Sequence, residues 1–463
     1  MKTKYVLGIL FLYCIPVAFS QVGTFQGIYF LNDNRFATSG IQTFDGGYVF
    51  ASAGSGVDVV KLRNDGIIEW QKNYPVGTWD KISQTKDSGY ILCGSSPSGA
   101  CLLRLDKDGD SLWYETYGSS ILARFFCVRE NHDRGFIAAG FWWNKGYLVR
   151  TNVNGGVEWE ELSTSVNCQF KDFVFDHDFD IVVAGDDFQK SNIILSRFDQ
   201  SGTILFNQSG FNSEYIESSE RIILSYDMKY IVSGYCRRIQ AVDTFNTHFT
   251  VIDTTGALIR QKYYSSVMLF PAKSSDSMNY VLGGYLPLQS HNYLFHFTKV
   301  SGTGEIIWSR DLENALRVTV PYDLSLCYDG GYLSVGSYLD TNTSLQSAYI
   351  VKTNSECRAA NPVGIFPIHA TKLEINSNKI FAYPNPFNGT LNVRIHVERP
   401  GVHEFSVFDI SGKCVFKLFR RFLAKGLHTF RLDTVDRLEH SGVFFLSLRS
   451  KNDQTVFRII NIK

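Results

Sequence analysis

Short apolar runs alternate with polar, glycine-containing stretches along most of the chain. Seven of these runs share one pattern, an aromatic or aliphatic anchor followed by apolar residues and then small residues or glycine: GGYVFAS, SGYILCG, RGFIAAG, FDIVVAG, KYIVSGY, NYVLGGY and GGYLSVG. The anchors are Tyr48, Tyr90, Phe136, Ile181, Tyr230, Tyr280 and Tyr332, at intervals of 42, 46, 45, 49, 50 and 52 residues. Runs of this length and composition are typical of buried β-strands, and their regular spacing indicates a repeat architecture.

A second unit follows each of the first six anchors and consists of an apolar strand, a turn with glycine and a strand with an aromatic residue. The turn glycine precedes the aromatic residue by four positions in five copies, and Arg260 replaces the aromatic in the remaining one. The aromatic residues are Trp70, Trp113, Trp159, Phe206 and Trp308. We interpret them as packing between neighbouring repeats, with sugar stacking as the alternative, because their presence in nearly every repeat favours a structural role.

The second of these turns reads DKDGD and places three carboxylates, Asp106, Asp108 and Asp110, at alternate positions. Calcium loops begin in this way, and so do tight β-turns. The other copies (RNDG, NVNGG, FDQSG, DTTG and SGTG) keep the glycine and lose the set of three carboxylates. The sequence therefore predicts a turn at this position and no metal site.

Each repeat holds four short strands, and seven such repeats are typical of a β-propeller, with an open β-solenoid as the alternative. The seventh repeat ends at AYIVKTNSECR and lacks its aromatic-bearing strand. Near the other end, Phe25-x-x-x-Tyr29 matches Trp70-x-x-x-Tyr74. We therefore expect the N-terminal strand to complete the last blade of a seven-bladed propeller over residues 21–357, which removes two exposed sheet edges.

The pattern changes after Cys357. Residues 358–378 contain two prolines and no repeat, which predicts a linker. Residues 379–463 hold alternating strands separated by Pro-Asn-Pro, Ser-Gly-Lys, Lys-Gly and Ser-Gly turns. The fold prediction is therefore all-β, a seven-bladed propeller followed by a small Ig-like β-sandwich.

The charge balance argues against a nucleic-acid-binding function. Lys+Arg and Asp+Glu both number 45, so no basic field is available for a nucleic acid.

Residues 1–20 combine two lysines, an apolar run and a small-x-small end, which predicts a signal peptide cleaved between Ser20 and Gln21. No later apolar stretch reaches the length of a transmembrane segment. Cys93 and Cys101 lie near the ends of successive strands, where a disulfide and two buried thiols are both open.

The last 80 residues carry several motifs in a fixed order, ending with a strand that finishes at Lys463. They are Tyr383-Pro384-Asn385-Pro386-Phe387, a strand-turn containing Asp409, Gly412 and Lys413, a turn at Gly426, and a strand beginning at Gly442. This segment resembles the C-terminal sorting domain of proteins exported by the type IX secretion system of Bacteroidetes-like bacteria. The resemblance implies passage through the periplasm and across the outer membrane by the type IX machinery, removal of the domain, and release or attachment to a surface glycolipid. The alternative is an ordinary Ig-like module that binds a ligand.

The sequence contains no GxSxG elbow, HExxH motif or phosphate-binding loop. We therefore predict no catalytic residue and no cofactor. Two functions remain: a non-catalytic binding or adhesion scaffold for an unknown protein or glycan ligand, and a secreted polysaccharide-degrading hydrolase or lyase with its site at the channel mouth. We identify no carboxylate, histidine or arginine outlier shared among the loops, which favours the scaffold.

Overall fold

The computed structural model describes residues 23–461 apart from 32–34, 55, 212–213, 240–245, 266–267, 277, 288–292, 313–318, 341–343, 360–364, 367–378, 384–389, 398–399, 410–412, 425, 434–437, 439 and 451–453. Every regular element within this part of the chain is a β-strand. The chain divides into two compact units, Met1–Ile368 and His369–Lys463. The prediction of an all-β protein is confirmed.

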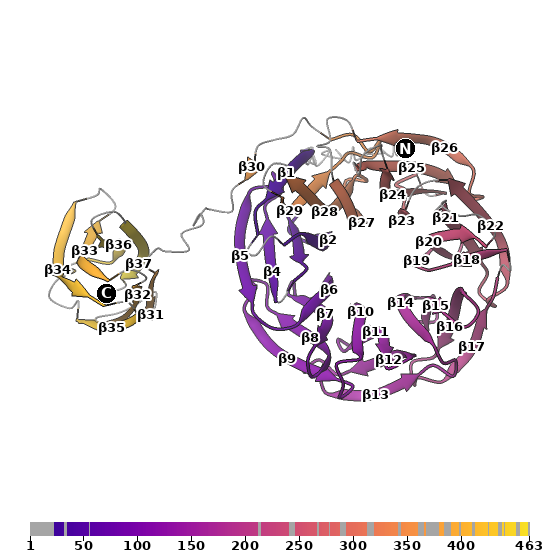
Figure 1. The fold of residues 1–463 in the computed structure, drawn as a ribbon, viewed down its shortest axis with the longest axis horizontal. Helices are drawn as coiled ribbons and strands as arrows, with labels where there is room; N and C mark the ends of the chain where they lie inside the picture. The colour runs from indigo at the N-terminus through magenta and orange to yellow at the C-terminus, as the bar shows by residue number, and fades with distance from the viewer. Residues whose placement is uncertain are drawn as a thin grey trace, which may run out of the picture. The chain divides into compact units, whose positions relative to one another are not determined.

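Seven sheets surround a central opening in the first unit (Figure 1). In each sheet, or blade, the first strand lies beside the opening and the fourth lies at the perimeter. The first four blades have consecutive strand order and consist of β2 (Ala37–Gln42), β3 (Tyr48–Ser52), β4 (Val57–Leu62), β5 (Ile68–Tyr74); β6 (Thr78–Gln84), β7 (Tyr90–Ser96), β8 (Gly99–Leu105), β9 (Ser111–Tyr117); β10 (Ala123–Glu130), β11 (Phe136–Trp142), β12 (Lys145–Thr151), β13 (Val157–Leu162); and β14 (Cys168–Phe175), β15 (Ile181–Asp187), β16 (Asn192–Phe198), β17 (Ile204–Ser209).

The fifth blade has a divided first strand, because β18 and β19 both pair with β20. The fifth and sixth blades and the first three strands of the seventh are β18 (Tyr215–Glu217), β19 (Arg221–Leu224), β20 (Tyr230–Arg238), β21 (Asn246–Ile252), β22 (Leu258–Ser265); β23 (Met268–Lys273), β24 (Asn279–Pro287), β25 (Tyr293–Ser301), β26 (Ile306–Asp311); and β27 (Thr319–Leu326), β28 (Tyr332–Asp340), β29 (Leu345–Lys352).

The seventh blade takes its fourth strand from the N-terminal side of the unit. Strand β1 (Phe25–Tyr29) pairs antiparallel with β29, with Phe25 opposite Lys352 and Tyr29 opposite Ala348. This is the ring closure that the Phe25-x-x-x-Tyr29 match predicts. Two residues from the stretch interpreted as a linker, β30 (Ile365–Phe366), pair in parallel with β1 and extend the same sheet.

The apolar core of the propeller lies between blades. Seven clusters of buried residues each combine side chains from two neighbouring sheets, and every anchor from Tyr48 to Tyr332 is at most 3% exposed. Both faces of the second and third strands are therefore buried. This explains why these strands read as continuous apolar runs without alternation.

The glycine corners are turns in which the backbone takes the left-handed conformation, with φ of +78° at Gly109 and +82° at Gly66. In the DKDGD corner, Asp106 accepts hydrogen bonds from the backbone N–H groups of Asp108 and Asp110, at 2.9 and 2.7 Å. Asp110 also pairs with Lys72 at 2.5 Å. The carboxylates of this corner therefore serve the turn and a neighbouring lysine.

The aromatic residue of each fourth strand packs against the next blade. A Cβ on Gly109 would lie 2.8 Å from the Trp70 ring, and Gly155 and Gly202 stand in the same relation to Trp113 and Trp159. The remaining members of the set behave alike, with Phe206 against Gly256, and with Trp308 half-buried in the core between the sixth and seventh blades.

A tyrosine four residues after the position of the aromatic, which is Arg260 in the fifth blade, forms a hydrogen bond to the same corner. Tyr29, Tyr117 and Tyr264 donate hydrogen bonds to the carbonyl groups of corner glycines in the next blade, at 2.6, 2.8 and 2.7 Å. The hydroxyl of Tyr74 does the same to Gly109. Blade-to-blade packing is thus both apolar and hydrogen-bonded.

Cys93 and Cys101 are both free and buried. Cys93 lies opposite Leu102 and Cys101 lies opposite Gly94, so the two thiols point to opposite faces of one sheet. They belong to the cores on either side of the second blade. A disulfide between them would require one strand to turn over.

The second unit contains two sheets that share one core. The sheets are β31 (Lys379–Tyr383), β32 (Thr390–Val397) and β35 (Gly426–Asp433), and β34 (Cys414–Leu423), β33 (Gly401–Asp409), β36 (Gly442–Arg449) and β37 (Gln454–Asn461), in these spatial orders. Buried residues from both, such as Val393 and Leu446, form one cluster. The unit is therefore a small two-sheet β-sandwich.

Candidate functional site at the channel mouth

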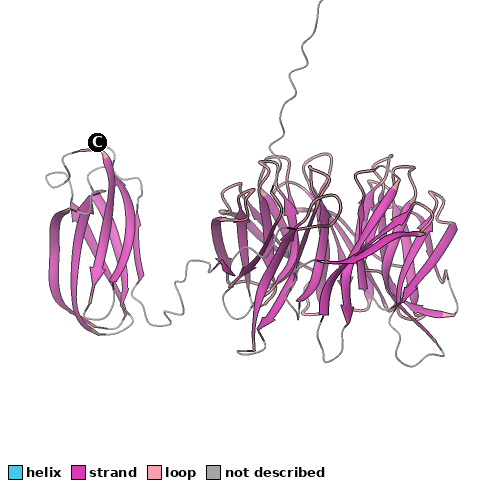
Figure 2. Ribbon diagram, turned by 90° about the horizontal axis from the view of Figure 1, so that it is seen from above, coloured by secondary structure: helices cyan, strands magenta, loops and turns pink. Residues whose placement is uncertain are grey.

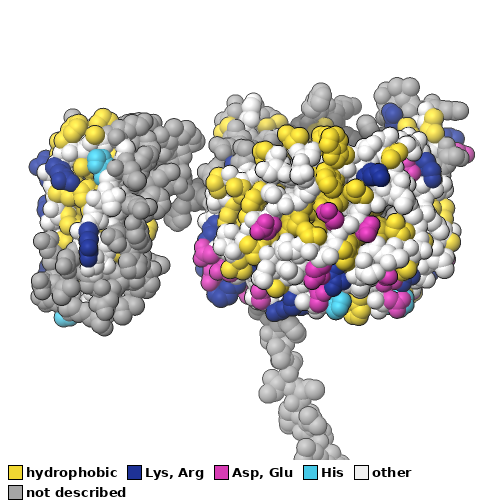
Figure 3. Space-filling model, turned by 90° about the horizontal axis from the view of Figure 1, so that it is seen from below, with side chains coloured by type: hydrophobic (Ala, Val, Ile, Leu, Met, Phe, Trp, Pro, Cys, Tyr) yellow, Lys and Arg dark blue, Asp and Glu magenta, His cyan; other side chains and the backbone are white. Residues whose placement is uncertain are grey.

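One face of the propeller carries the turns between the first and second strands of all seven blades. We call it the turn face. Successive strands of a blade run in opposite directions, so the turn between the third and fourth strands lies on the same face as the turn between the first and second. The glycine corners therefore lie on the turn face too. Figure 2 shows short loops on one face of the ring, and Figure 3 shows acidic and basic side chains gathered along one rim.

An aspartate recurs in every turn of this face, which the sequence analysis missed. It lies three residues before the anchor in six copies and four before it in the sixth repeat: Asp45, Asp87, Asp133, Asp178, Asp227, Asp276 and Asp329. The premise that no carboxylate is shared among the loops was therefore wrong. The spacing from the anchors was a signal that could have revealed it.

These aspartates hold the turns together. Asp45 accepts hydrogen bonds from the hydroxyl of Thr43 and the backbone N–H of Gly47, at 2.5 and 2.9 Å. In six blades the aspartate also pairs with a cation on the third strand, as Asp45 does with Lys61 at 2.9 Å. The other pairs are Asp87–Arg104, Asp133–Arg150, Asp178–Arg197, Asp276–Lys299 and Asp329–Lys352. The shared carboxylate is thus structural.

The fifth blade departs from this pattern, and the departure explains the exceptional Arg260. The third-strand cation lies opposite the fourth-strand aromatic, as Lys61 lies opposite Trp70. In the fifth blade the same pair is Val251 and Arg260. The apolar and basic residues have exchanged strands, and Asp227 pairs with Lys229 of its own turn instead.

All seven first strands end at the mouth of the central channel. Their last residues, Gln42, Gln84, Glu130, Phe175, Leu224, Lys273 and Leu326, line two adjoining cavities of about 420 and 480 Å³. The two cavities share Arg129, Ser325 and Leu326. Volumes in this range are typical of small-molecule sites.

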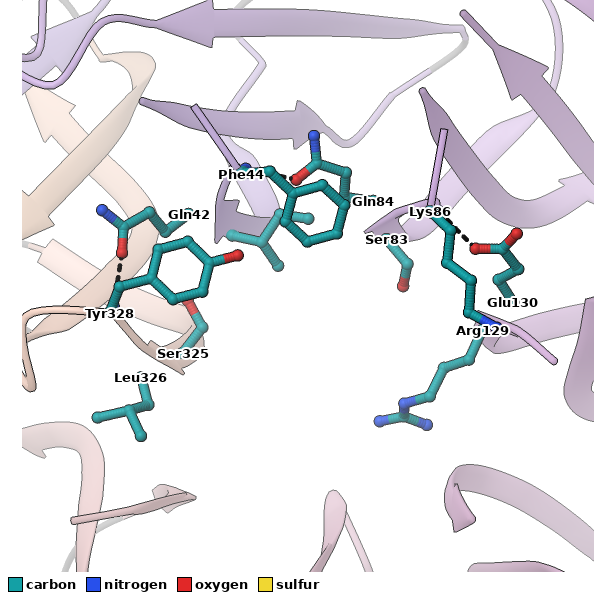
Figure 4. A pocket seen from close by; sticks show the side chains of 11 residues that line it. Gln42, Phe44, Ser83, Gln84, Lys86, Arg129, Glu130, Ser325, Leu326 and Tyr328 are labelled. Atoms are coloured by element: carbon teal, nitrogen blue, oxygen red, sulfur yellow. Dashed lines mark hydrogen bonds between the residues drawn. The ribbon is translucent and has the colours of Figure 1, made fainter. Parts of the chain in front are cut away.

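The smaller cavity has an aromatic and polar lining. Phe44 and Tyr328, which are 56% and 67% exposed, border it beside Gln42 and Gln84 (Figure 4). Gln42 accepts a hydrogen bond from the backbone of Tyr328 at 2.7 Å, and Gln84 accepts one from Phe44 at 2.8 Å. The amides therefore fix the turns that present the two rings to solvent.

A network of charges lies directly beneath the mouth. Asp323, which is 1% exposed, pairs with Lys81 at 2.9 Å and with Arg221, and accepts a hydrogen bond from Ser39 at 2.9 Å. Asp172 pairs with Arg129 at 2.9 Å. These residues come from the first strands of six different blades, so the network bridges the channel.

Both carboxylates stay ionised at neutral pH. Burial acts to raise the pKa of Asp323, but the charges of Arg221 and Lys81 outweigh it and hold the pKa far below its usual range. The pKa of Asp172 is lowered in the same way, with Arg129 the largest opposing charge. Neither group can supply a proton to a substrate at pH 7.

The described residues offer one group of potential metal ligands, Asp176, His177 and Asp178. Arg197 lies 2.9 Å from Asp176 and 3.1 Å from Asp178 and forms an ion pair with each of these carboxylates. The arrangement is that of an ion-paired turn.

The structure places the other predicted residues away from this mouth. Trp70, Trp113, Trp159, Phe206 and Trp308 lie on the perimeter strands. In the second unit, Asp409 and Lys413 close one turn through two 3.0 Å hydrogen bonds, Tyr383 ends β31, and Gly426 and Gly442 begin β35 and β36. Outside the described residues lie Ser20, Gln21, Pro384, Asn385, Pro386, Phe387, Gly412 and Lys463.

A family model described as the secretion system C-terminal sorting domain matches residues 381–463. The second unit is a C-terminal sorting domain. The resemblance found in the sequence is confirmed, and with it the assignment of the chain as cargo that the type IX system exports to the cell surface or secretes. No described helix is long and apolar enough to cross a membrane.

Three solved structures have a similar arrangement of strands. The WD40 β-propeller domain of Doa1 shares 11% identity over 69% of this chain and 94% of its own, with a TM-score of 0.46. A protein of unknown function from Bacteroides caccae shares 13% over 57% and 92%, with a TM-score of 0.38. PorZ, a surface component of the type IX secretion system of Porphyromonas gingivalis, shares 11% over 94% and 59%, with a TM-score of 0.40. A search of curated proteins found no match.

Proposed function

We propose that the sorting domain delivers the propeller to the outer cell surface or the medium, where the propeller acts as a non-catalytic binding module. Its ligand contacts the channel mouth on the turn face. The observation that supports this assignment is the pair of exposed rings, Phe44 and Tyr328, which lie beside the smaller cavity and whose backbone N–H groups donate hydrogen bonds to glutamines of neighbouring blades. Exposed aromatic rings on a rigid scaffold are typical of binding surfaces.

The ion pairs of the buried carboxylates at the mouth support a binding role rather than polysaccharide hydrolysis. A glycosidase requires one carboxyl group with a raised pKa to protonate the leaving oxygen. Asp172 and Asp323 have lowered pKa values because arginines and a lysine surround them. Glu130 accepts a hydrogen bond from the backbone of Lys86 at 2.6 Å. The described mouth residues therefore favour binding over hydrolysis.

Ligand arrays test this proposal. The purified protein is applied to arrays of peptides and oligosaccharides, alongside the double variant Phe44→Ala/Tyr328→Ala. The control is Phe188→Ala, because Phe188 is 57% exposed but follows β15 on the opposite face. Loss of two stacking rings at about 1–2 kcal/mol each predicts at least a tenfold loss of affinity, with the control unchanged.

Two results would contradict the proposal. Binding that survives the double variant would place the ligand elsewhere. Release of reducing ends from polysaccharides by the intact protein, lost in a mouth variant, would establish the hydrolase instead.

A further inference from the structure

The larger of the two mouth cavities has an apolar wall. It lies among the first strands of the third to seventh blades and is lined by Val174, Phe175, Ile223, Leu224, Ala272 and Leu326. Such a wall favours a ligand with an apolar group. A sugar placed there would leave hydroxyl groups without hydrogen-bond partners, at a cost of about 1–3 kcal/mol each.

Cations outnumber carboxylates at the same place. Arg129, Arg221 and Lys273 line the larger cavity, and Lys81 lies in the network beneath it. Against these four cations stand Asp172 and Asp323. The four cations exceed the two carboxylates by two positive charges. In the smaller cavity, Lys86 and Glu130 carry opposite charges and add no net charge.

Lys273 is the cation best placed to meet a ligand. It is the last residue of β23, and its ammonium group lies 4.8 Å from the centre of the Tyr226 ring. Among the described residues, no carboxylate forms an ion pair with it, whereas Arg129 and Arg221 are both engaged with buried aspartates. A ligand carboxylate would supply the missing partner.

We propose that the channel mouth binds a peptide segment that presents a carboxylate beside an apolar side chain. The apolar side chain enters the larger cavity, the carboxylate meets Lys273, and the backbone continues over Phe44 and Tyr328 in the adjoining cavity. The continuity of the two cavities through Arg129 and Leu326 suits an extended chain. This inference rests on the proposed binding function and adds the class of ligand.

Affinity selection from a random hexapeptide library tests the inference directly. The bound fraction is sequenced for the full protein and for Lys273→Glu, with Lys190→Gln as the control, because Lys190 is exposed in the turn after β15 on the opposite face. We expect enrichment of peptides with Asp or Glu next to a large apolar residue. Lys273→Glu should abolish the enrichment and Lys190→Gln should preserve it.

Affinity measurements on an enriched peptide then separate charge from shape. Lys273→Gln should weaken binding about tenfold, and replacing the acidic residue of the peptide by its amide should weaken it by a similar factor. Raising sodium chloride from 50 to 500 mM should weaken the acidic peptide more than its amide, because salt screens the ion pair.

Three outcomes of the peptide selection would overturn the inference. They are no enrichment, enrichment of neutral or basic peptides, and enrichment that survives Lys273→Glu. An oligogalacturonide probe that binds in place of peptides and is lost in Lys273→Glu would identify an acidic glycan ligand. That result would sink the peptide assignment while leaving the proposed binding function intact, since the Phe44→Ala/Tyr328→Ala arrays test that function separately.

Discussion

Glu217 should make the stability of the propeller depend on pH. Its side chain is 3% exposed at the end of β18, where one carboxylate oxygen accepts hydrogen bonds from Tyr263 at 2.7 Å and from Gln261 at 2.8 Å. The other oxygen, Oε2, is buried without a hydrogen-bond partner among the described residues. Burial raises the pKa of Glu217 from 4.5 to about 7, and outweighs the two hydrogen bonds that act to lower it.

The raised pKa of Glu217 makes the folded protein less stable at higher pH. Between pH 4.5 and 7 the folded protein keeps a proton on Glu217 that the unfolded chain releases, so folding loses stability as the pH rises through that window. At about 1.4 kcal/mol per pKa unit, the penalty above pH 7 is about 3 kcal/mol. For a unit of about 340 residues, this corresponds to about 4 °C in the melting temperature.

Thermal melts of Glu217→Gln and the unmodified protein, from pH 4.5 to 8 at constant ionic strength, measure the penalty. The difference in melting temperature, variant minus unmodified, should increase by about 4 °C as the pH rises from 4.5 to 7, because glutamine cannot ionise. Other titrating groups are common to both proteins and cancel in the difference. A difference that stays flat across this range would refute the reasoning.

His248 provides a control of opposite sign. Burial lowers its pKa from 6.5 to about 4, so the unfolded chain binds the extra proton and stability is lost as the pH falls through that window. The melting temperature of His248→Gln, relative to that of the unmodified protein, should therefore increase as the pH falls. If both variants shifted in the same direction, a general effect of cavity or packing would explain them instead.

Three further predictions concern the ring and its cysteines. Tyr29→Phe removes the buried 2.6 Å hydrogen bond to the first blade and should cost about 1–2 kcal/mol, or about 2 °C; an unchanged melting temperature would contradict the inter-blade role of that hydroxyl. Phe25→Ala, at a side chain 2% exposed, should cost about 3–5 kcal/mol, or about 4–7 °C, and no loss would show that β1 does not complete the ring. Cys93 and Cys101 should both be alkylated after denaturation without reductant, and a mass short of both adducts would reveal a disulfide.

The repeat pattern allowed the propeller to be predicted because both faces of its central strands are buried. Seven apolar runs and six glycine corners define the blades, and the Phe25-x-x-x-Tyr29 match identifies the strand that closes the ring. The pairing of β30 with β1 was missed, because two apolar residues between prolines give no periodic signal.

The mouth was harder to predict because its residues are not alike. Gln42, Phe175 and Lys273 occupy the same place in their blades, and only the ring brings them together. The buried ions Asp172 and Asp323 come from blades far apart in the sequence, so no local spacing links them to Arg129 and Arg221. The turn aspartates could have been predicted from the sequence, since their separation from the anchors along the chain is nearly constant.

The intact mass of the protein recovered from the native cell surface and from the medium tests the central claim most directly. If the propeller is exported cargo, the mass should lack residues 1–20 and the segment after about residue 378, with added mass at the new C-terminus where a surface glycolipid is attached. A mass that retains residues 381–463 on the exported protein would contradict removal of the sorting domain and would make that domain a candidate for the binding function.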